Sequence, residues 1–411
     1  MKFLFVLENL SARCGANVNI VMTLLRHLNN NNEVHVLTKY GASRAIDEEK
    51  GARSATVRAF DFDQVGYVTA FQEKRQWRKL SSIKRFLLLL THPRVLLYML
   101  DAKYGFSFSK RRFQKELEAV CRAEAFDAVI GVAAPYYIAR AVADANISCK
   151  KTVIQLDPYT YNYTLPAWQI RHRARCEERV IDKLDVLFAV SFVRDEICEK
   201  KIYANLNKIV PFELPGIVEK QEEDLRAKQE KRTDDSVHFV FAGQFYNVIR
   251  NPEYLLSLFT HLPENYVLHI VGGGTPDILE KYKAILGDRL VLHGWMSSEE
   301  AKRKVQEADV LVNLNNSISN QLASKLFDYI STGKPLLNVC KGEGCLSLKY
   351  TKKYTNCLDL TESVQIADSQ IDQLIAFVNE HLGTVVAQSE IMEAFQENTE
   401  IYVAQLIQNW L

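Results

Sequence analysis

The chain has 411 residues, of which 47% are hydrophobic and 25% are charged, and its formal net charge at pH 7 is +1. These values exclude a disordered chain, and the length is sufficient for two globular domains. A charge near zero excludes a global field that would attract nucleic acid, so any anion-binding function must depend on local groups.

Cysteine spacing and apolar patterning favour a cytoplasmic protein. The eight cysteines include no CxxC pair, so we expect reduced thiols and no metal site. No uncharged apolar run reaches the roughly 20 residues that a membrane-spanning helix needs. We therefore expect a cytoplasmic protein whose membrane contact, if any, is peripheral and at the inner face of the cell membrane.

Short apolar runs alternate with longer helical stretches, which is the βαβ pattern of parallel sheets covered by helices on both faces. In the first half the predicted strands are Lys2–Leu7, Val34–Thr38, Ala128–Gly131, Thr152–Leu156 and Val186–Ser191. In the second half they are Val237–Ala242, Val267–Val271, Leu290–Leu292, Val310–Leu314 and Leu336–Val339. The predicted fold class is α/β, with two Rossmann-like parallel-sheet domains facing each other across a cleft.

The strand pattern stops and restarts once, at a charged stretch between Leu214 and Val237. Such a stretch cannot be core, so we predict an N-terminal domain over residues 1–213 and a C-terminal domain over 214–388. In the last segment, 389–411, apolar residues recur at near-helical spacing, which predicts an amphipathic helix packing back on the N-terminal domain. Ligands of open parallel sheets bind beyond the carboxyl ends of the strands, so functional residues are expected at strand-to-helix turns.

Two turns of the first domain are candidate site segments. Gly15, after the opening strand, keeps the start of the next helix open to a ligand. Asp157 follows a predicted strand, where its carboxylate is suited to orienting an acceptor hydroxyl; a strand-ending turn is the alternative. Glu177 is interpreted as a structural carboxylate. The Asp-Phe-Asp sequence at 61–63 imitates a metal-binding DxD, but we interpret it as a loop because it lies far from the other candidate groups.

Residues 74–100 combine basic residues with tryptophan and leucine. This composition suits a helix that lies on an anionic membrane surface. The alternative is a helical insertion that packs on the first domain with its basic side chains in solvent.

The first strand of the second domain ends at Gly243 and leads into a loop that contains Gln244, Tyr246 and Arg250. Gly243 allows a sharp turn and leaves room for a ligand. The planar guanidinium of Arg250 is suited to binding phosphate oxygens. The alternative is a structural glycine followed by an ordinary surface arginine.

The strongest constellation follows the strand that ends at Leu314, and it contains Asn320, Gln321, Ser324, Lys325 and Asp328. Small and polar residues there let backbone N–H groups at a helix start face an anion, and Lys325 adds a full charge. Asp328 lies one turn after Ser324, where its carboxylate is suited to a ribose diol. Together these groups are able to hold a nucleotide diphosphate. Alternatively, Lys325 and Asp328 are an exposed pair on a helix surface.

Two short segments resemble those of a known protein family: Ser-Lys-Leu-Phe-Asp-Tyr at 324–329 and Gly-Lys-Pro at 333–335. They resemble the retaining glycosyltransferases of the GT-B class, family 4 or group 1, in a branch associated with bacterial polysaccharide assembly. The resemblance spans nearly the whole chain. In this family two acidic residues lie eight positions apart, the first near the donor sugar and the second near the ribose. Asp328 matches the second position, whereas Asn320 stands at the first and leaves the identity of the sugar open.

The resemblance implies a metal-independent hexosyltransferase without a cofactor. Its donor would be a nucleoside-diphosphate sugar, and a hydroxyl of a glycan or lipid-linked acceptor would receive the sugar with retention, in surface polysaccharide assembly such as that of capsule or exopolysaccharide. Arg250 and Lys325 would neutralise the leaving diphosphate. Gly272, Gly294 and Trp295 resemble family turns at the donor, the last two near the nucleobase; tight turns and a core tryptophan are the alternative.

Other functions fit the same architecture. A nicotinamide dehydrogenase is disfavoured because no glycine turn forms a GxGxxG followed by an acidic ribose ligand. A sugar-nucleotide epimerase would bind the donor without an acceptor. An inactive binding partner of another transferase is the remaining alternative, and it is motivated by Asn320.

Overall fold

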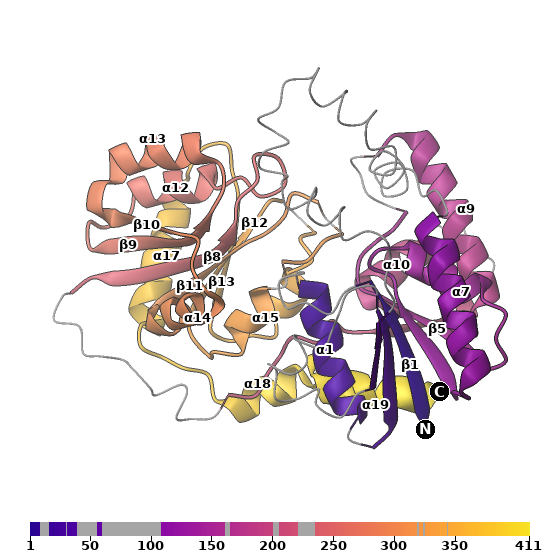
Figure 1. The fold of residues 1–411 in the computed structure, drawn as a ribbon. Helices are drawn as coiled ribbons and strands as arrows, with labels where there is room; N and C mark the ends of the chain where they lie inside the picture. Colours follow the sequence, from indigo (N-terminus) through magenta and orange to yellow (C-terminus); the bar gives the residue numbers. More distant parts are fainter. Residues whose placement is uncertain are drawn as a thin grey trace. The chain divides into compact units, whose positions relative to one another are not determined.

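The computed structural model describes residues 1–8, 16–29, 31–38, 56–59, 108–160, 165–199, 205–220, 235–318, 320–323, 325–342 and 344–411. The chain divides into two compact units. The first unit comprises Met1–Leu214 together with Val403–Leu411, and the second comprises Pro215–Tyr402 (Figure 1). Among the described helices, none is long and apolar enough to cross a membrane.

The first unit is built on a seven-stranded sheet in the order β3-β2-β1-β4-β5-β6-β7, and all neighbouring strands are parallel. Its strands are β1 Lys2–Leu7, β2 Glu33–Thr38, β3 Thr56–Ala59, β4 Ala128–Val132, β5 Lys150–Gln155, β6 Val186–Val190 and β7 Ile209–Phe212. Its helices are α1 Ala16–Asn29, α7 Phe108–Ala123, α8 Tyr137–Asp144, α9 Ala167–Lys183 and α10 Ser191–Glu199, with a 3-10 turn at Leu206–Lys208. Every residue of β4 is buried, as expected for a central parallel strand.

The second unit is built on a six-stranded parallel sheet in the order β10-β9-β8-β11-β12-β13. Its strands are β8 Val237–Gln244, β9 Tyr266–Gly273, β10 Leu290–Gly294, β11 Val310–Leu314, β12 Leu336–Cys340 and β13 Cys357–Thr361. Its helices are α12 Glu253–Thr260, α13 Pro276–Leu286, α14 Ser298–Glu307, α15 Lys325–Ile330, α16 Leu348–Thr351, α17 Asp368–His381 and α18 Gln388–Ala394, and α19 Glu400–Trp410 continues into the first unit. Short 3-10 turns lie at Gly287–Arg289 and Gln396–Asn398.

In both sheets the order in which strands are added reverses beside the first strand. β1 lies between β2 and β4, and β8 lies between β9 and β11. This is the order of a doubly wound fold, which confirms the predicted α/β class with two Rossmann-like domains. In such sheets a ligand binds beyond the carboxyl ends of the strands at the point of reversal. The loops after β8 and β11 are therefore the expected ligand-binding loops of the second unit.

Helices cover both faces of the second sheet. On one face, apolar residues of α12, α13 and α17 pack on alternate residues of the strands, such as Phe239, Leu268 and Val312. On the other face α15 is anchored by Tyr329, whose buried hydroxyl accepts a hydrogen bond from the backbone N–H of Ala242 at 2.9 Å. This bond fixes α15 directly beneath the carboxyl end of β8.

The C-terminal segment differs from the predicted single helix. It consists of α18, a 3-10 turn and α19, and only Val403–Leu411 belongs to the first unit. The break has a structural cause, because the carbonyl of Asn398 accepts backbone hydrogen bonds from Gly216 at 3.0 Å and Ile217 at 3.1 Å. Thr399 also forms a parallel bridge with Ile217. Pairing with this segment at the start of the second unit interrupts the helix.

Candidate functional site

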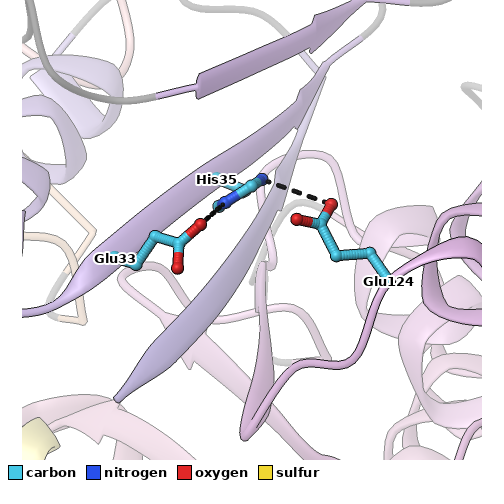
Figure 2. Close-up of side chains that lie close together, drawn as sticks. All are labelled: Glu33, His35 and Glu124. Carbon is cyan, nitrogen blue, oxygen red and sulfur yellow. Dashed lines mark hydrogen bonds and ion pairs between the residues drawn. The ribbon is translucent and has the colours of Figure 1, made fainter.

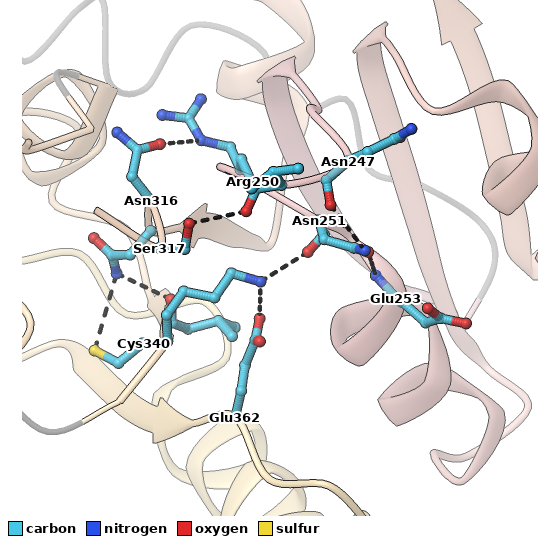
Figure 3. A network of polar contacts seen from close by, with 12 residues as sticks. Asn247, Arg250, Asn251, Glu253, Asn316, Ser317, Cys340 and Glu362 are labelled. Atoms are coloured by element: carbon cyan, nitrogen blue, oxygen red, sulfur yellow. Dashed lines mark hydrogen bonds and ion pairs between the residues drawn. The ribbon is translucent and has the colours of Figure 1, made fainter. Parts of the chain in front are cut away.

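The loops after β8 and β11 are joined at the reversal point of the second sheet. Tyr246 and Arg250 exchange two backbone hydrogen bonds, of 3.0 and 3.2 Å, which close the first loop into a tight turn. Ser317, after β11, donates from its backbone N–H to the carbonyl of Ile249 at 2.6 Å and from its hydroxyl to the carbonyl of Val248 at 2.9 Å. Figure 3 shows this meeting of the two loops. These hydrogen bonds between the two loops restrain the backbone position of Arg250.

Arg250 is a partly buried cation whose side chain is held by an amide. Its Nε donates to Oδ1 of Asn316 at 3.0 Å (Figure 3). A Cβ at Gly243 would lie 3.8 Å from its Nη1, so the guanidinium extends over the end of β8. Burial lowers its pKa, yet arginine remains protonated at neutral pH. In the described ranges, no carboxylate pairs with Arg250 and no hydrogen bond uses its two terminal nitrogens, so they are available to an anion.

A pocket of about 120 Å³ lies beside this arginine and is lined by Asn315, Asn316, Ser317, Ile318, Gln321, Lys341, Gly342, Gly344, Cys345 and Leu346. Ligand pockets for whole small molecules have volumes of about 300–1,000 Å³, so this one accommodates only part of a nucleotide sugar. Asn316 connects the pocket with the arginine, because its Nδ2 donates to the carbonyl of Gln321 at 3.5 Å. Asn316 lies two residues after the end of the buried strand β11, and it was not among the site residues predicted from the sequence.

Lys341, at the pocket wall, is not a free cation. Its Nζ donates to the carbonyl of Asn251 at 2.9 Å and forms an ion pair with Glu362. Burial raises the pKa of Glu362, while Lys341 acts in the opposite direction. Lys341 therefore links the ends of β12 and β13 to the segment before α12.

Two of the glycines at the carboxyl end of β9 are required by close packing. Gly272 has φ +121° and Gly274 has φ +113°, conformations that side chains rarely adopt. A Cβ at Gly272 would overlap the carbonyl oxygen of Gly243, and one at Gly274 would overlap that of Phe245. Gly272 thus lets the ends of β8 and β9 approach each other beside Arg250.

Trp295 is 66% exposed, so the alternative of a core tryptophan is wrong. It follows Gly294, whose φ of +69° turns the chain at the end of β10. A Cβ at Gly273 would lie 3.4 Å from the indole Nε1, so the ring lies beside the end of β9. The carboxyl edge of β9 and β10 therefore presents an exposed aromatic face.

Only some of the predicted residues in and before α15 lie at the pocket beside Arg250. Asn320 is buried, with 7% exposure, and Gln321 lines the pocket. Lys325 and Asp328 form an ion pair with 3.2 Å between Nζ and Oδ2, and their side chains are 53% and 58% exposed. The structure therefore matches the exposed-pair alternative. Ser324 and Gly15 lie outside the described residues, as do residues 61–63 and 74–100.

Asp157 belongs to the first unit and is exposed in the turn after β5. The turn is supported from below by Glu177, a buried carboxylate that accepts hydrogen bonds from Gln155 Nε2 at 2.8 Å and from the hydroxyl of Thr160. The structural interpretation of Glu177 is confirmed. Gln155 also donates to the main-chain carbonyl of Asp157 at 3.3 Å, which leaves the Asp157 carboxylate outside this contact.

A polar ladder that was not predicted from the sequence crosses β11, β12 and β13. Asn338 faces Asn313 on one side and Asp359 on the other in the strand register. Its Oδ1 accepts from Asn313 and Asn315, both at 2.7 Å, and its Nδ2 donates to Asp359 at 2.7 Å and to Ser347 at 2.9 Å. A buried amide satisfied on both atoms specifies one strand register, and here it supports the pocket wall from below.

Three histidines form a second ladder across β8, β9 and β10. His238 Nδ1 lies 2.8 Å from His269 Nε2, and His269 Nδ1 lies 2.9 Å from His293 Nε2. Each such contact needs one protonated and one bare nitrogen, so the ladder favours neutral rings. Burial lowers the pKa of His293, Lys304 of α14 acts in the same direction, and Glu307 opposes them.

This ladder predicts that acid destabilises the second unit. The pKa of His293 is lower in the folded state than its ordinary value of 6.5, so between these two values the unfolded chain binds the proton and the folded chain does not. Stability should therefore fall as the pH falls through this window, by at most about 1.4 kcal/mol per pH unit. Between pH 8 and pH 5 the melting temperature of His293→Gln should decrease less than that of the wild type. The exposed His261→Gln should retain the wild-type slope, and equal slopes for wild type and His293→Gln would contradict the account.

One group of the described residues places three possible metal ligands within 4.8 Å of one another: Glu33, His35 and Glu124 (Figure 2). The ammonium of Lys2 already lies between the two carboxylates, 2.9 Å from Glu33 and 2.7 Å from Glu124. The carboxylates raise the pKa of Lys2, which keeps it cationic. The group lies at the amino ends of β1 and β2, away from the edge where ligands bind, and we interpret it as a structural ion cluster.

No protein-family model matches the sequence, and no curated protein matches it. Solved structures match it along its whole length. HepE of Anabaena in complex with UDP has a TM-score of 0.67 at 10% identity, covering 100% of this chain and 99% of HepE. The lipopolysaccharide outer core galactosyltransferase WaaB has a TM-score of 0.58 at 12% identity, covering 100% and 99%.

A Listeria monocytogenes protein assigned as a UDP-N-acetylglucosamine 2-epimerase is also similar, with a TM-score of 0.53 at 11% identity, covering 99% of this chain and 94% of that one. Identities of this size establish the architecture alone. Since both units share the doubly wound order and the match extends over both, the chain has the GT-B fold.

Proposed function

We propose that this chain is a glycosyltransferase that moves a sugar from a nucleoside-diphosphate sugar to a hydroxyl acceptor. The observation that carries the proposal is Arg250, a partly buried cation without a carboxylate partner among the described residues, held by Asn316 at the reversal point of the second sheet. A cation in that position is suited to a diphosphate. HepE, which shares the fold, was solved with UDP, and this supports UDP as the nucleotide.

Each candidate residue then has a role. Arg250 binds the diphosphate, and Gly243 leaves room for it. Trp295, exposed beside Gly294, offers a face for the nucleobase. The donor contacts proposed besides these are Gly15, Gln244, Tyr246, Gly272, Asn320, Gln321, Ser324 and Asp328. In the structure Lys325 is paired with Asp328. If the donor ribose binds the carboxylate of Asp328, the ammonium of Lys325 is released and contributes its charge to binding the diphosphate.

The chemistry proposed is transfer with retention of the anomeric configuration. The bond between the anomeric carbon and the diphosphate oxygen breaks, and its electron pair remains on the diphosphate. The acceptor oxygen forms the new bond on the same face and gives its proton to the leaving phosphate. Arg250 stabilises the charge that develops on the diphosphate, which is an electrostatic contribution of the kind that dominates many enzymes. Asp157 of the first unit would orient the acceptor hydroxyl.

Metal independence is one prediction of this role for Arg250. A fixed guanidinium supplies the charge that a divalent ion supplies in the DxD-containing class, so transfer should survive an excess of EDTA. The measurement is the rate of sugar transfer with EDTA and after addition of magnesium or manganese. Loss of activity with EDTA and recovery with either ion would contradict the prediction and would redirect attention to Asp61 and Asp63.

Epimerisation of the donor is the second candidate, favoured by the fold shared with the Listeria protein. The two functions separate by their products. Incubation with UDP-sugars alone should return unchanged donor, apart from slow hydrolysis, whereas addition of a hydroxyl acceptor should yield UDP and a glycosylated product. Conversion of one UDP-sugar into another without an acceptor would establish the epimerase. Donor binding without either product would support the inactive partner.

A glycan or lipid-linked acceptor of surface polysaccharide assembly is proposed by analogy with WaaB, a lipopolysaccharide galactosyltransferase. Contact with an anionic membrane through residues 74–100 stays a prediction. The described helix α9 offers the same chemistry, because Trp168 is 54% exposed and Arg171, Arg175 and Arg179 are exposed along one side of the helix. Such a surface is suited to anionic headgroups.

A further inference from the structure

Two cysteines meet at the wall of the pocket. Cys340 is the last residue of β12 and is fully buried, whereas Cys345 is partly exposed and lines the pocket. The hydroxyl oxygen of Ser347 lies 3.7 Å from the sulfur of Cys340 and 3.4 Å from that of Cys345. One hydroxyl group thus lies within hydrogen-bonding range of both sulfurs. The pair is therefore assembled by the fold before any bond joins it.

The surroundings favour negative charge on Cys345 and not on Cys340, because the neighbouring Cys345 and burial raise the pKa of Cys340. Nδ2 of Asn338 lies 3.4 Å from the sulfur of Cys340, and Nδ2 of Asn315 lies 3.9 Å from it. The neighbouring Cys340 thiol and hydrogen bonds from Ser347 and the backbone of Lys341 lower the pKa of Cys345, although burial acts against them. A thiolate, not a thiol, is the nucleophile in thiol–disulfide exchange.

We infer that Cys345 and Cys340 form a thiol–disulfide exchange site, with Cys345 as the attacking group and Cys340 as the resolving one. Its co-reactant is a small disulfide such as oxidised glutathione. The Cys345 thiolate attacks one sulfur of that disulfide and releases the first glutathione thiolate. Cys340 then loses its proton and attacks the sulfur of Cys345, which releases the second. Two protein thiols are oxidised to one disulfide, and the glutathione disulfide is reduced to two thiols that take up the protons.

The consequence for the pocket follows from its lining. Lys341, Gly342, Gly344, Cys345 and Leu346 supply half of the wall, and they lie in or next to the short loop that the bond would close. A Cβ at Gly342 or Gly344 would meet nothing within 4 Å, so both glycines border open space. Oxidation should therefore reshape the pocket beside Arg250 and weaken nucleotide binding. This last step rests on the proposed function, whereas formation of the disulfide does not.

A second thiol pair gives the experiment its control. In the first unit, the neighbouring thiol of Cys121 lowers the pKa of Cys149. The background for all measurements is therefore the full chain with Cys121→Ser and Cys149→Ser. Cys357, whose pKa burial raises, is the inert thiol for comparison.

The test is treatment of this background protein with oxidised glutathione, followed by intact mass and tryptic mapping. Lys341 lies between the two cysteines, so trypsin separates them unless a disulfide joins the fragments. We expect a mass lower by two hydrogens and the linked fragments. Cys340→Ser should instead accumulate a glutathione adduct on Cys345, Cys345→Ser should form neither product, and Cys357→Ser should behave like the background. Unlinked fragments, or an equal adduct on Cys340 in Cys345→Ser, would overturn the inference.

Two further measurements complete the test. The first does not depend on the correct folding of a Cys340 or Cys345 variant, and the second measures the effect of oxidation on the pocket. In the background protein with both cysteines intact, alkylation of Cys345 should follow a pH profile whose midpoint lies below the ordinary thiol value, and Ser347→Ala should move it upward. A midpoint at the ordinary thiol value near 8.5 would overturn the inference. UDP binding should weaken on oxidation and recover with dithiothreitol. Unchanged binding by the oxidised protein would refute the coupling to the pocket, whereas absence of binding by the reduced protein would refute the proposed function and leave the disulfide result standing.

Discussion

Arg250→Ala is expected to lower kcat by about 10²–10³-fold, which corresponds to about 3–4 kcal/mol of lost transition-state stabilisation, by analogy with the loss of one oxyanion-stabilising donor. The charge on the diphosphate grows as the sugar bond breaks, so a fixed cation interacts more strongly with the transition state than with the intact donor. The effect on kcat should therefore exceed that on the donor KM. Steady-state kinetics beside melting temperatures are the measurement.

Stability should change little in Arg250→Ala. The substitution removes the hydrogen bond to Asn316, but it also removes the cost of burying a cation that has no carboxylate partner among the described residues. Arg289→Ala is the matched control, because its guanidinium donates to the carbonyls of Phe259 and Leu262 at 2.7 and 3.0 Å and holds the fold instead. That variant should lose melting temperature without a specific loss of kcat. Near-normal turnover in Arg250→Ala would refute the assigned role.

Gly272→Ala should be the most destabilising single substitution at the site. Its φ of +121° costs a side chain about 1–3 kcal/mol, and the overlap of the new Cβ with the carbonyl of Gly243 adds about 1–3 kcal/mol of overpacking. For a domain of this size the total of about 2–6 kcal/mol lowers the melting temperature by about 5–20 °C. Scanning calorimetry gives this value directly.

Gly294→Ala is the control for the backbone contribution alone. Gly294 has φ +69°, but a Cβ there would meet no atom within 4 Å. Its substitution should therefore cost only about 1–2 kcal/mol, as expected for one residue in a left-handed conformation. Equal losses in the two variants would show that the close approach of β8 and β9 contributes nothing to stability.

The strands that the sequence predicted best are the buried central ones. β11 was predicted with its observed bounds, Val310–Leu314, because a strand covered on both faces reads as a continuous apolar run. The edge strands β7 and β13 were not predicted. β7 contains Pro211, which cannot donate to a sheet ladder, and β13 contains the exposed Asp359. Both therefore lack the apolar run that identifies central strands.

Candidate site residues that lie close together in the sequence were predictable. Gly243 and Arg250 lie on a strand and the loop that follows it, so local sequence reveals them. Asn316 and the Asn338 ladder were not predictable, because their roles depend on which strands are neighbours and in what register. The pairing of Lys325 with Asp328 was foreseen as an alternative, since residues three apart on a helix face each other.

The measurement that tests the central claim most directly is calorimetric titration of wild type and Arg250→Ala with UDP and with a UDP-sugar. UDP carries the charge that develops on the leaving group, so the account predicts saturable binding of UDP by the wild type. It also predicts that Arg250→Ala weakens the binding of UDP more than that of the intact UDP-sugar. The absence of nucleotide binding to a folded wild-type chain, or equal affinities for UDP in the two proteins, would contradict a diphosphate site at the junction of β8 and β11.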